Sequence, residues 1–303
     1  MFENKSRQIA KVFRSSDLNV KELITGLDDR TCDIPTVIVD RTSYPGVEAH
    51  LFTIGDAAQW KAEFTDERDV LLRYPIAKPE TIETTVLIKR NAQAWTTLTS
   101  VLSCIMESMN LYKQNITRGE FATVIWGHHA TEWHREMWES RTHEYIHPAN
   151  FIEYVDPSIR TQITELNNLG FATVESCSGL LIDHPDREPY RPYVMFDERS
   201  YFGSAPHFFT LGDMAGWESM YAPHGFDVYI RVFSDDNIET AWTRLLNKAR
   251  ILSPLLSLYR SSRAKTASTH LNCDRKSNAD DNESTQFLID DTTQRFLGPN
   301  DLQ

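Results

Sequence analysis

The sequence predicts a mixed α/β fold in two folded regions, followed by a polar tail. The chain has 303 residues, of which 41% are hydrophobic and 24% charged, an ordinary globular composition with enough length for a substantial core. Short apolar runs that indicate strands alternate with apolar positions at helical spacing. Because this pattern changes near residue 150, we expect an N-terminal region over 1–150, an α/β domain over 151–263 and a tail over 264–303.

The N-terminal region is interpreted as mixed α/β, with no assigned role. Its strands are predicted where β-branched and other apolar residues run together, at 35–40, 50–54, 84–89 and 121–126. Its helices are predicted at about 95–112 and 131–145. The region is interpreted without an internal repeat that would relate it to the rest of the chain.

The domain over 151–263 is expected to be a compact helix-strand-strand-strand-helix unit. Asp156-Pro157 indicates a helix start, because Asp is favoured at the N-cap and Pro at the first helical position. Gly170 is placed where that helix should end. The strands are predicted at 171–175, 193–196 and 226–233. A last helix is expected to begin at a Ser234 cap and to run to about Pro254.

The tail over 264–303 is predicted to be mostly disordered. It is rich in Ser, Thr, Asn, Asp and Lys, with short apolar islands only at 287–289 and 296–297. Such a segment buries too little apolar surface to offset the entropy of ordering it. A solvated tail is the favoured interpretation, and docking of the islands on a protein partner is the alternative.

Charge and cysteine usage limit the partners and the compartment. The net charge of −12 argues against a general nucleic-acid-coating protein, although a local basic patch could still hold RNA. Four cysteines without paired spacing, and an N-terminus without an apolar segment, favour the cytoplasm. The uncharged stretch at 91–106 is too short and too polar to span a bilayer, so no membrane insertion is expected.

The sharpest motif is the turn Ser176, Cys177, Ser178 and Gly179, directly after a predicted strand. Small polar residues and a glycine allow backbone N–H groups and hydroxyls to face a phosphate, a carboxylate or the polar end of a cofactor. We therefore predict a small-molecule site at these four residues, with Cys177 also a candidate catalytic residue. The alternative is a plain polar turn with a buried, inert cysteine.

Ionisable side chains are concentrated in the loop that follows, over 180–192. His184 can exchange a proton near neutral pH, and Arg187 and Arg191 are suited to gripping a carboxylate or phosphate. His224, just before the third predicted strand, is expected at the same end of the sheet. His184 and His224 are therefore the candidates for proton transfer, and a solvated loop with offsetting charges is the alternative.

Several features of 151–255 occur together in one order. They are the Asp-started helix that ends in Leu-Asn (156–167), the aromatic-x-Thr strand into Ser-Cys-Ser-Gly (171–179), a Trp-containing segment that ends in His (217–224) and an Ala-rich last helix (241–249). In this combination the span resembles the wybutosine-synthesis tRNA methyltransferase family. The resemblance implies a small α/β fold that uses S-adenosylmethionine to methylate a guanosine derivative in tRNA. The family continues its motif with Arg, where this chain has Leu180.

A second cluster carries metal-ligating residue types, at His128, His129, Glu132 and His134. On a helix, His129 and Glu132 would lie about one turn apart, which is a usable spacing for metal ligands. The H-E-x-x-H pattern is absent, and the alternative is an amphipathic helix that packs its tryptophans against the rest of the protein.

Three functions follow from these features. The first is an S-adenosylmethionine-dependent or other small-ligand enzyme that acts on RNA or a nucleotide-like substrate. The second is a metal-dependent enzyme that uses the histidine cluster. The third is a non-catalytic ligand-binding or interaction protein. Nucleotide hydrolysis of the P-loop type is excluded, because no Gly-rich phosphate loop of that pattern is present.

Overall fold

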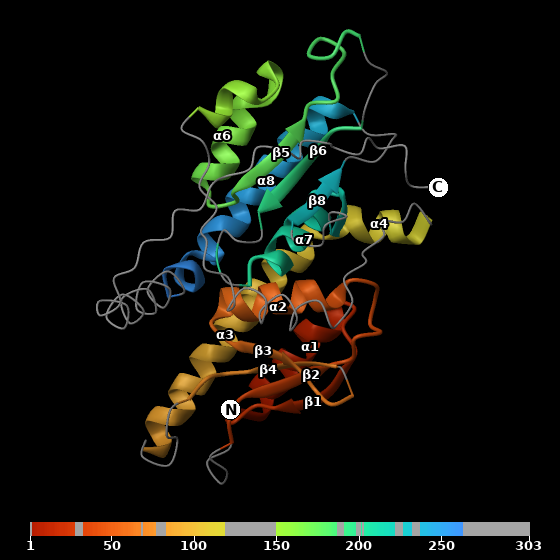
Figure 1. Cartoon of the computed structure of the whole chain (residues 1–303). Helices are drawn as coiled ribbons and strands as arrows, with labels where there is room; N and C mark the ends of the chain where they lie inside the picture. Colours follow the sequence, from red (N-terminus) through yellow and green to blue (C-terminus); the bar gives the residue numbers. More distant parts are fainter. Residues whose placement is uncertain are drawn as a thin grey trace, which may run out of the picture. The chain divides into compact units, whose positions relative to one another are not determined.

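The protein has a mixed α+β fold with two four-stranded antiparallel sheets (Figure 1), which confirms the predicted class. The computed structural model describes residues 2–27, 33–67, 69–76, 83–118, 150–186, 191–197, 201, 203–221, 227–231 and 237–262. The predicted strand at 121–126, the predicted helix at 131–145 and the tail over 264–303 lie outside these residues.

The first sheet belongs to a helix-strand-strand-helix-strand-strand-helix series. Its elements are α1 (Phe2–Ser15), β1 (Val20–Ile24), β2 (Thr36–Val39), α2 (Val47–Ala58), β3 (Lys61–Phe64), β4 (Val70–Arg73) and α3 (Thr84–Ser108), and α4 (Asn110–Arg118) follows. The strand order is β1-β2-β4-β3. Val37, Val39 and Leu72 alternate toward the interior and are fully buried, as period-two patterning requires.

The second sheet belongs to a series with the same order of elements. Short helices η2 (Phe151–Tyr154) and η3 (Pro157–Ile159) precede α6 (Arg160–Asn168), β5 (Thr173–Cys177), β6 (Tyr193–Asp197), α7 (Ala205–Met214), β7 (Glu218–Tyr221), β8 (Asp227–Arg231) and α8 (Ile238–Leu255). The strand order β5-β6-β8-β7 reproduces the topology of the first sheet. Residues 2–118 and 150–262 are therefore called the first and second copy.

The two copies are related in sequence as well as in topology. Residues 36–64 align without a gap on 193–221, at an offset of 157 positions. Twelve of these positions are identical, and in the first copy they are Val37, Asp40, Ser43, Tyr44, Gly46, His50, Phe52, Thr53, Gly55, Asp56, Ala58 and Trp60. The interpretation without an internal repeat is therefore wrong. The repeat is hard to see because the loops that flank it differ in length between the copies.

Equivalent residues continue beyond the aligned segment. Three such pairs are Trp95 and Trp242, Tyr112 and Tyr259, and Gly26 and Gly179. Both glycines have a positive φ, 59° in the first copy and 70° in the second, in the left-handed region that glycine enters without steric cost. The turn after β1 and the turn after β5 thus share a backbone conformation.

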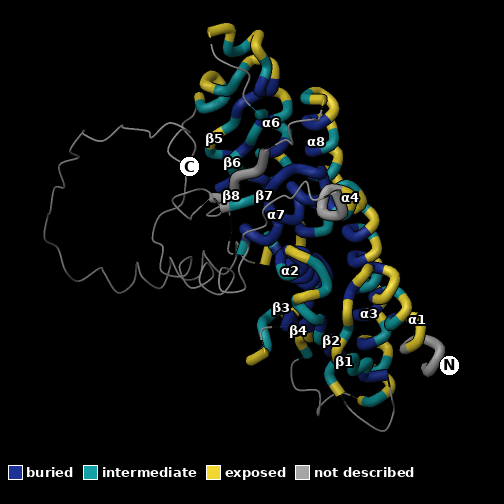
Figure 2. The backbone as a smooth tube through the Cα atoms, turned by 90° about the vertical axis from the view of Figure 1, so that its right-hand side faces the viewer, coloured by how far each residue is buried: buried dark blue, intermediate teal, exposed yellow. Residues whose placement is uncertain are grey.

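The helices α2 and α7 are buried along almost their whole length (Figure 2). Every residue of α7 is buried, and so is every residue of α2 except Glu48. A helix covered on all sides loses the amphipathic period, so its sequence resembles a short apolar strand. This explains why the predicted strand at 50–54 is wrong and why α7 was not predicted.

Other differences from the predicted elements also have local causes. The segment 84–89 is the start of α3 rather than a strand, and within it only Leu87 is buried. The second copy contains one helix and one strand, α7 and β7, beyond the predicted unit. The cap of α8 is Asn237, whose side chain accepts a hydrogen bond from the Thr240 N–H at 3.0 Å.

Candidate functional site

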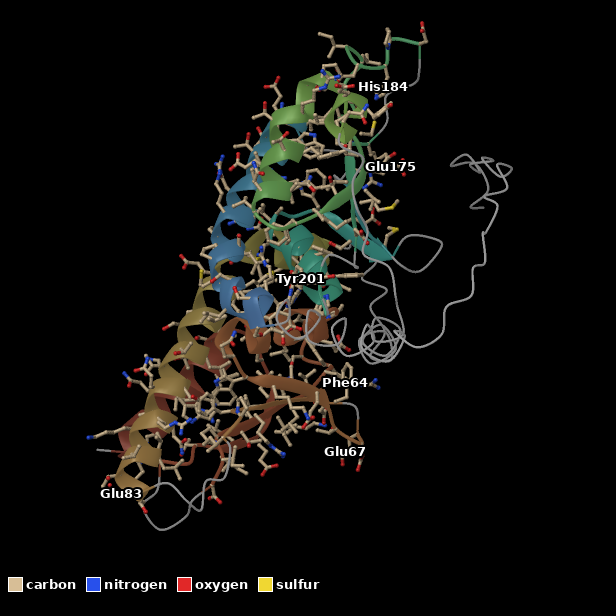
Figure 3. The ribbon with its side chains drawn as sticks, turned by 60° about the vertical axis from the view of Figure 1, so that its left-hand side comes forward. Phe64, Glu67, Glu83, Glu175, His184 and Tyr201 are labelled. Carbon is tan, nitrogen blue, oxygen red and sulfur yellow. The ribbon has the colours of Figure 1, made fainter. Side chains whose placement is uncertain are left out.

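Three side chains from separate segments converge beyond the end of β5, where His184 is seen in Figure 3. His184 Nε2 lies 2.9 Å from Asp156 Oδ2 and 3.5 Å from Cys177 Sγ. The three potential ligand atoms all lie within 4.8 Å of one another. We call these residues the Asp156–Cys177–His184 cluster.

Each member of the cluster is held by its own element. Cys177 is the last residue of β5 and is buried, with 9% of its surface exposed. His184 follows on a turn that is closed by a hydrogen bond from the Asp183 N–H to the Leu180 carbonyl, 3.1 Å long. Asp156 directly precedes η3, and its side chain makes no capping bond to that helix. The side chains of Asp156 and His184 are 15% and 25% exposed.

Asp156 is the member that the sequence did not reveal. Asp-Pro was interpreted only as a helix cap, but the carboxylate instead accepts a hydrogen bond from the Ser178 N–H at 2.7 Å and contacts His184. The carboxylate therefore joins the segment before η3 to the turn after β5. The available signal was the occurrence of Asp, Cys and His within one region, each a ligand type, without a sequence spacing that links them.

Asp183 fastens the turn from the other side. The Ser158 hydroxyl donates a hydrogen bond to the Asp183 carboxylate. Burial works against ionisation of this carboxyl, yet hydrogen bonds from Ser158 and Ser178 and the nearby His184 hold its pKa below the usual range. An ionised Asp183 thus keeps the turn against η3, with His184 next to Asp156.

The polar groups of Ser178 are used inside the protein. Ser178 is fully buried, its N–H donates to Asp156, and its hydroxyl accepts from the Leu180 N–H at 3.1 Å. Its carbonyl accepts from Trp242 Nε1 at 3.5 Å. These donors are engaged with the protein, and the predicted ligand cradle at Ser176 and Gly179 stays a prediction.

The remaining predicted site residues are placed as follows. Arg191 Nη2 donates to Glu218 Oε2 at 3.0 Å, so this guanidinium has a carboxylate partner in the protein. The others lie outside the described residues, namely Arg187, His224, His128, His129, Glu132 and His134.

The geometry of the cluster does not match a Cys-His-Asp proton relay. In a relay the carboxylate holds one ring nitrogen while the other faces the nucleophile. Here Asp156 and Cys177 both contact Nε2 of His184. Convergence on a single point suits a metal ion instead, because a thiolate, an imidazole nitrogen and a carboxylate oxygen are all zinc ligands.

The first copy carries the same turn with an apolar residue at the position of Cys177. Ile24, Thr25 and Gly26 take the places of Cys177, Ser178 and Gly179. Trp95 Nε1 donates to the Thr25 carbonyl at 2.8 Å, as Trp242 does to the carbonyl of Ser178. The scaffold of the turn therefore forms without a thiol.

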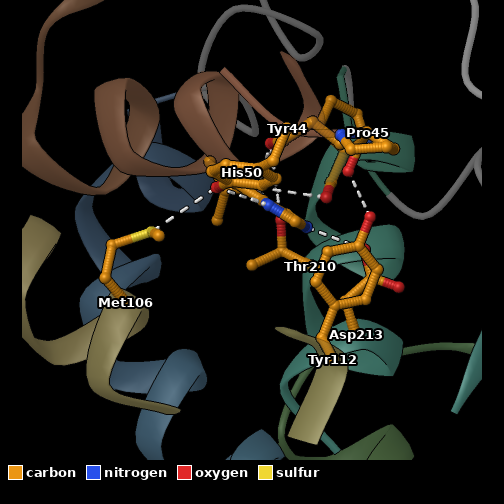
Figure 4. Close-up of polar contacts among 10 residues, drawn as sticks. Tyr44, Pro45, His50, Met106, Tyr112, Thr210 and Asp213 are labelled. Atoms are coloured by element: carbon orange, nitrogen blue, oxygen red, sulfur yellow. Dashed lines mark hydrogen bonds and ion pairs between the residues drawn. The ribbon is translucent and has the colours of Figure 1, made fainter. Parts of the chain in front are cut away.

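A second group of ionisable residues lies at the contact between the copies (Figure 4). His50 Nε2 is 2.7 Å from Asp213 Oδ2, and His50 Nδ1 is 3.0 Å from the Tyr44 hydroxyl. Tyr112 packs edge-on against His50, with ring centroids 5.4 Å apart. Burial is the main cause that raises the pKa of Asp213 and of Tyr44.

The equivalent group makes the same contacts with the roles of the two copies exchanged. His207 Nε2 is 3.0 Å from Asp56 Oδ2, and His207 Nδ1 is 2.8 Å from the Tyr201 hydroxyl. Between the two groups, the hydroxyls of Thr53 and Thr210 are 2.7 Å apart. Both histidines are fully buried, so we interpret these groups as the structural contact between α2 and α7 rather than as a site for a ligand.

No protein-family model, no curated protein and no solved structure matches this chain. The resemblance to the wybutosine-synthesis family therefore stays a prediction. In the part of the chain that the structure describes, no helix combines the length and apolar character needed to cross a bilayer.

Proposed function

We propose that this chain is a zinc-dependent enzyme whose metal is bound by Asp156, Cys177 and His184. The observation that carries the proposal is their convergence, with all three ligand atoms within 4.8 Å. Zinc binds nitrogen and oxygen at about 2.0–2.2 Å and sulfur at about 2.3 Å, so one ion can reach all three atoms after small side-chain adjustments. Binding requires that His184 lose the Nε2 proton and Cys177 its thiol proton.

Three protein ligands leave one position of a tetrahedral zinc ion open, as in catalytic zinc sites. Asp156 and His184 are partly exposed, so a water molecule and a substrate can reach that position from solvent. Zinc lowers the pKa of a bound water to about 7 and makes hydroxide available at neutral pH. The reaction class that this arrangement supports is hydrolysis.

Two observations make this proposal stronger than S-adenosylmethionine binding at the same turn. The Ser178 N–H and hydroxyl, which a cofactor would use, are bonded to Asp156 and Leu180. In addition, Arg191, one of the two arginines predicted to bind an anionic group, is paired with Glu218. The metal proposal needs only side chains that already meet.

Zinc titration tests the proposal. The full chain, purified without a histidine tag, is titrated against a chromogenic chelator, and we expect one zinc ion per chain. Cys177→Ser and His184→Gln should each weaken binding by more than about tenfold, because each removes a ligand. Cys104→Ser is the matched control, since Cys104 is a free thiol on α3.

Cobalt substitution and turnover extend the test. Cobalt bound at the site should give a thiolate charge-transfer band that Cys177→Ser abolishes. Zinc-dependent hydrolysis of activated esters or phosphodiesters should disappear in the same variants. A full chain that binds no zinc, or whose binding survives both ligand substitutions, would show the proposal to be wrong.

A further inference from the structure

The two copies connect their contact surface to their turns through the same kind of buried path. In the second copy the path begins at Asp213 on α7, which contacts His50 of the first copy. The Trp217 N–H then donates to the Gly212 carbonyl at 2.9 Å, which fixes Trp217 at the end of that helix. Trp217 packs edge-on against Trp242, with ring centroids 5.1 Å apart.

The path ends at the Asp156–Cys177–His184 cluster. Trp242 Nε1 donates to the Ser178 carbonyl, and the Ser178 N–H donates to Asp156 Oδ2 at 2.7 Å. Trp242 is 2% exposed, and Asp213, Trp217 and Ser178 are fully buried. A displacement at one end is therefore transmitted to the other end, because these buried side chains are close-packed and close-packed interiors transmit strain.

The first copy contains the equivalent path, which leads to the turn after β1 rather than to the Asp156–Cys177–His184 cluster. His207 contacts Asp56 on α2, and Trp60 after α2 packs on Trp95 with centroids 4.8 Å apart. Trp95 donates to the Thr25 carbonyl, and the residue before Thr25 is Ile24, at the position of Cys177. The molecule thus carries its own control for any effect of such a path on the cluster.

We infer that Trp242 and His50 are positioning residues for the Asp156–Cys177–His184 cluster, with α7 as the element that joins them. The inference rests on the proposed zinc site and adds to it the residues outside the ligands that set its geometry. His50 belongs to the first copy, so the first copy contributes to the site in the second.

The physical basis is the cost of an unpaired buried group. Removing His50 leaves the buried Asp213 carboxylate without its imidazole partner, and a shift of α7 would relieve the cost of this unpaired group. Such a shift would move Trp217, which follows α7, against Trp242. Removing the indole N–H of Trp242 releases the Ser178 carbonyl directly, and Ser178 holds Asp156.

The first experiment compares Trp242→Phe with Trp95→Phe in the full chain. Each keeps an aromatic ring and removes one N–H to a turn carbonyl, so both should fold. We expect the zinc dissociation constant to rise about tenfold in Trp242→Phe and less than twofold in Trp95→Phe. Equal zinc affinities in the two variants would overturn the inference.

The second experiment moves to the contact between the copies. His50→Gln and His207→Gln break equivalent contacts and should lower the unfolding midpoint by similar amounts. Only His50→Gln should weaken zinc binding, by about threefold or more. If zinc affinity depended only on the stability of the fold, both variants would lose the same affinity, and that result would contradict the inference.

A readout without metal separates this inference from the proposed function. The alkylation rate of Cys177 in metal-free protein, resolved by peptide mass spectrometry, should change in Trp242→Phe and not in Trp95→Phe, while Cys104 serves as the internal reference. Unchanged Cys177 reactivity would reject the coupling even if zinc binds. Absence of zinc binding by the wild type would reject the proposed function, whatever the alkylation shows.

Discussion

At the scale of single residues, the site depends on which nitrogen of His184 is approached. Asp156 and Cys177 contact the same atom, Nε2. This shared contact differs from that of a nucleophile with its base, and it is the basis of the proposed metal site. Cys177 and His184 were predicted from the sequence, since a small polar turn and an ionisable loop are local features. Asp156 was not, because its role depends on a contact 22 positions along the chain, to Ser178.

The lowered pKa of Asp183 leads to a prediction about acid stability. A carboxyl group whose pKa is lower in the folded than in the unfolded protein stabilises the fold at pH values above its unfolded pKa of about 3.9. This stabilisation is lost as the pH falls through the folded pKa. The wild type should therefore exceed Asp183→Asn in unfolding free energy at pH 6, and the gap should close in strong acid. Urea unfolding at a series of pH values measures it, with the exposed Asp186→Asn as control. A gap that stays constant down to pH 2.5 would contradict the prediction.

At the scale of elements, α2 and α7 show how a helix can be hidden in a sequence. Both are buried on every side and their polar residues face each other, so neither has the solvent-exposed polar face from which an amphipathic helix is predicted. The strands β5, β6 and β8 were predicted because each lies in an alternating or apolar run bounded by turn residues. The polar residues inside α2 and α7 bond across the pair, which the sequence of either helix alone does not reveal.

The hydroxyl pair at the centre of this contact leads to a prediction about coupling. Thr53→Val and Thr210→Val should each lower the unfolding free energy by about 1–2 kcal/mol, since each leaves a buried hydroxyl with one partner fewer. The double variant should lose clearly less than the sum, because it removes both hydroxyls together. Urea unfolding of the four proteins in a double-mutant cycle measures this, and losses that add within about 0.3 kcal/mol would exclude direct coupling.

The start of α8 leads to a simpler prediction. Asn237→Ala should lower the unfolding free energy by about 1 kcal/mol, because the Thr240 N–H loses its side-chain acceptor. Asn237→Ser keeps an acceptor at the cap and should stay close to the wild type. Thermal unfolding followed by circular dichroism compares the three proteins, and equal losses in both variants would argue against a capping role.

At the scale of the molecule, the two copies share one hydrophobic core among the described residues. Composition and local patterning were sufficient to predict a mixed fold. The relation between the copies was not predicted, because its identities are spread over a strand, a turn and a helix, between loops of unequal length. The single core implies that both copies unfold together.

Zinc binding should therefore stabilise the whole molecule rather than the second copy alone. At a free zinc concentration of 100 times the dissociation constant, the unfolding free energy should rise by about 2.7 kcal/mol. Tryptophans occur in both copies, so fluorescence and circular dichroism should report one shifted transition. Cys177→Ser should abolish the shift, and a zinc effect confined to one of two separate transitions would contradict a shared core.

The crossed histidine–aspartate contacts also bear on how a doubled gene can change over time. His50 bonds to Asp213, and His207 bonds to Asp56. A substitution at any of these four residues therefore leaves its partner in the other copy without that contact. Among the described residues, the turns after β1 and β5 have no such contact between the copies, and Ile24 in the first copy occupies the position of Cys177 in the second. A change at the shared contact thus requires a matching change in the other copy, while the turn after β5 can differ from the turn after β1 without one.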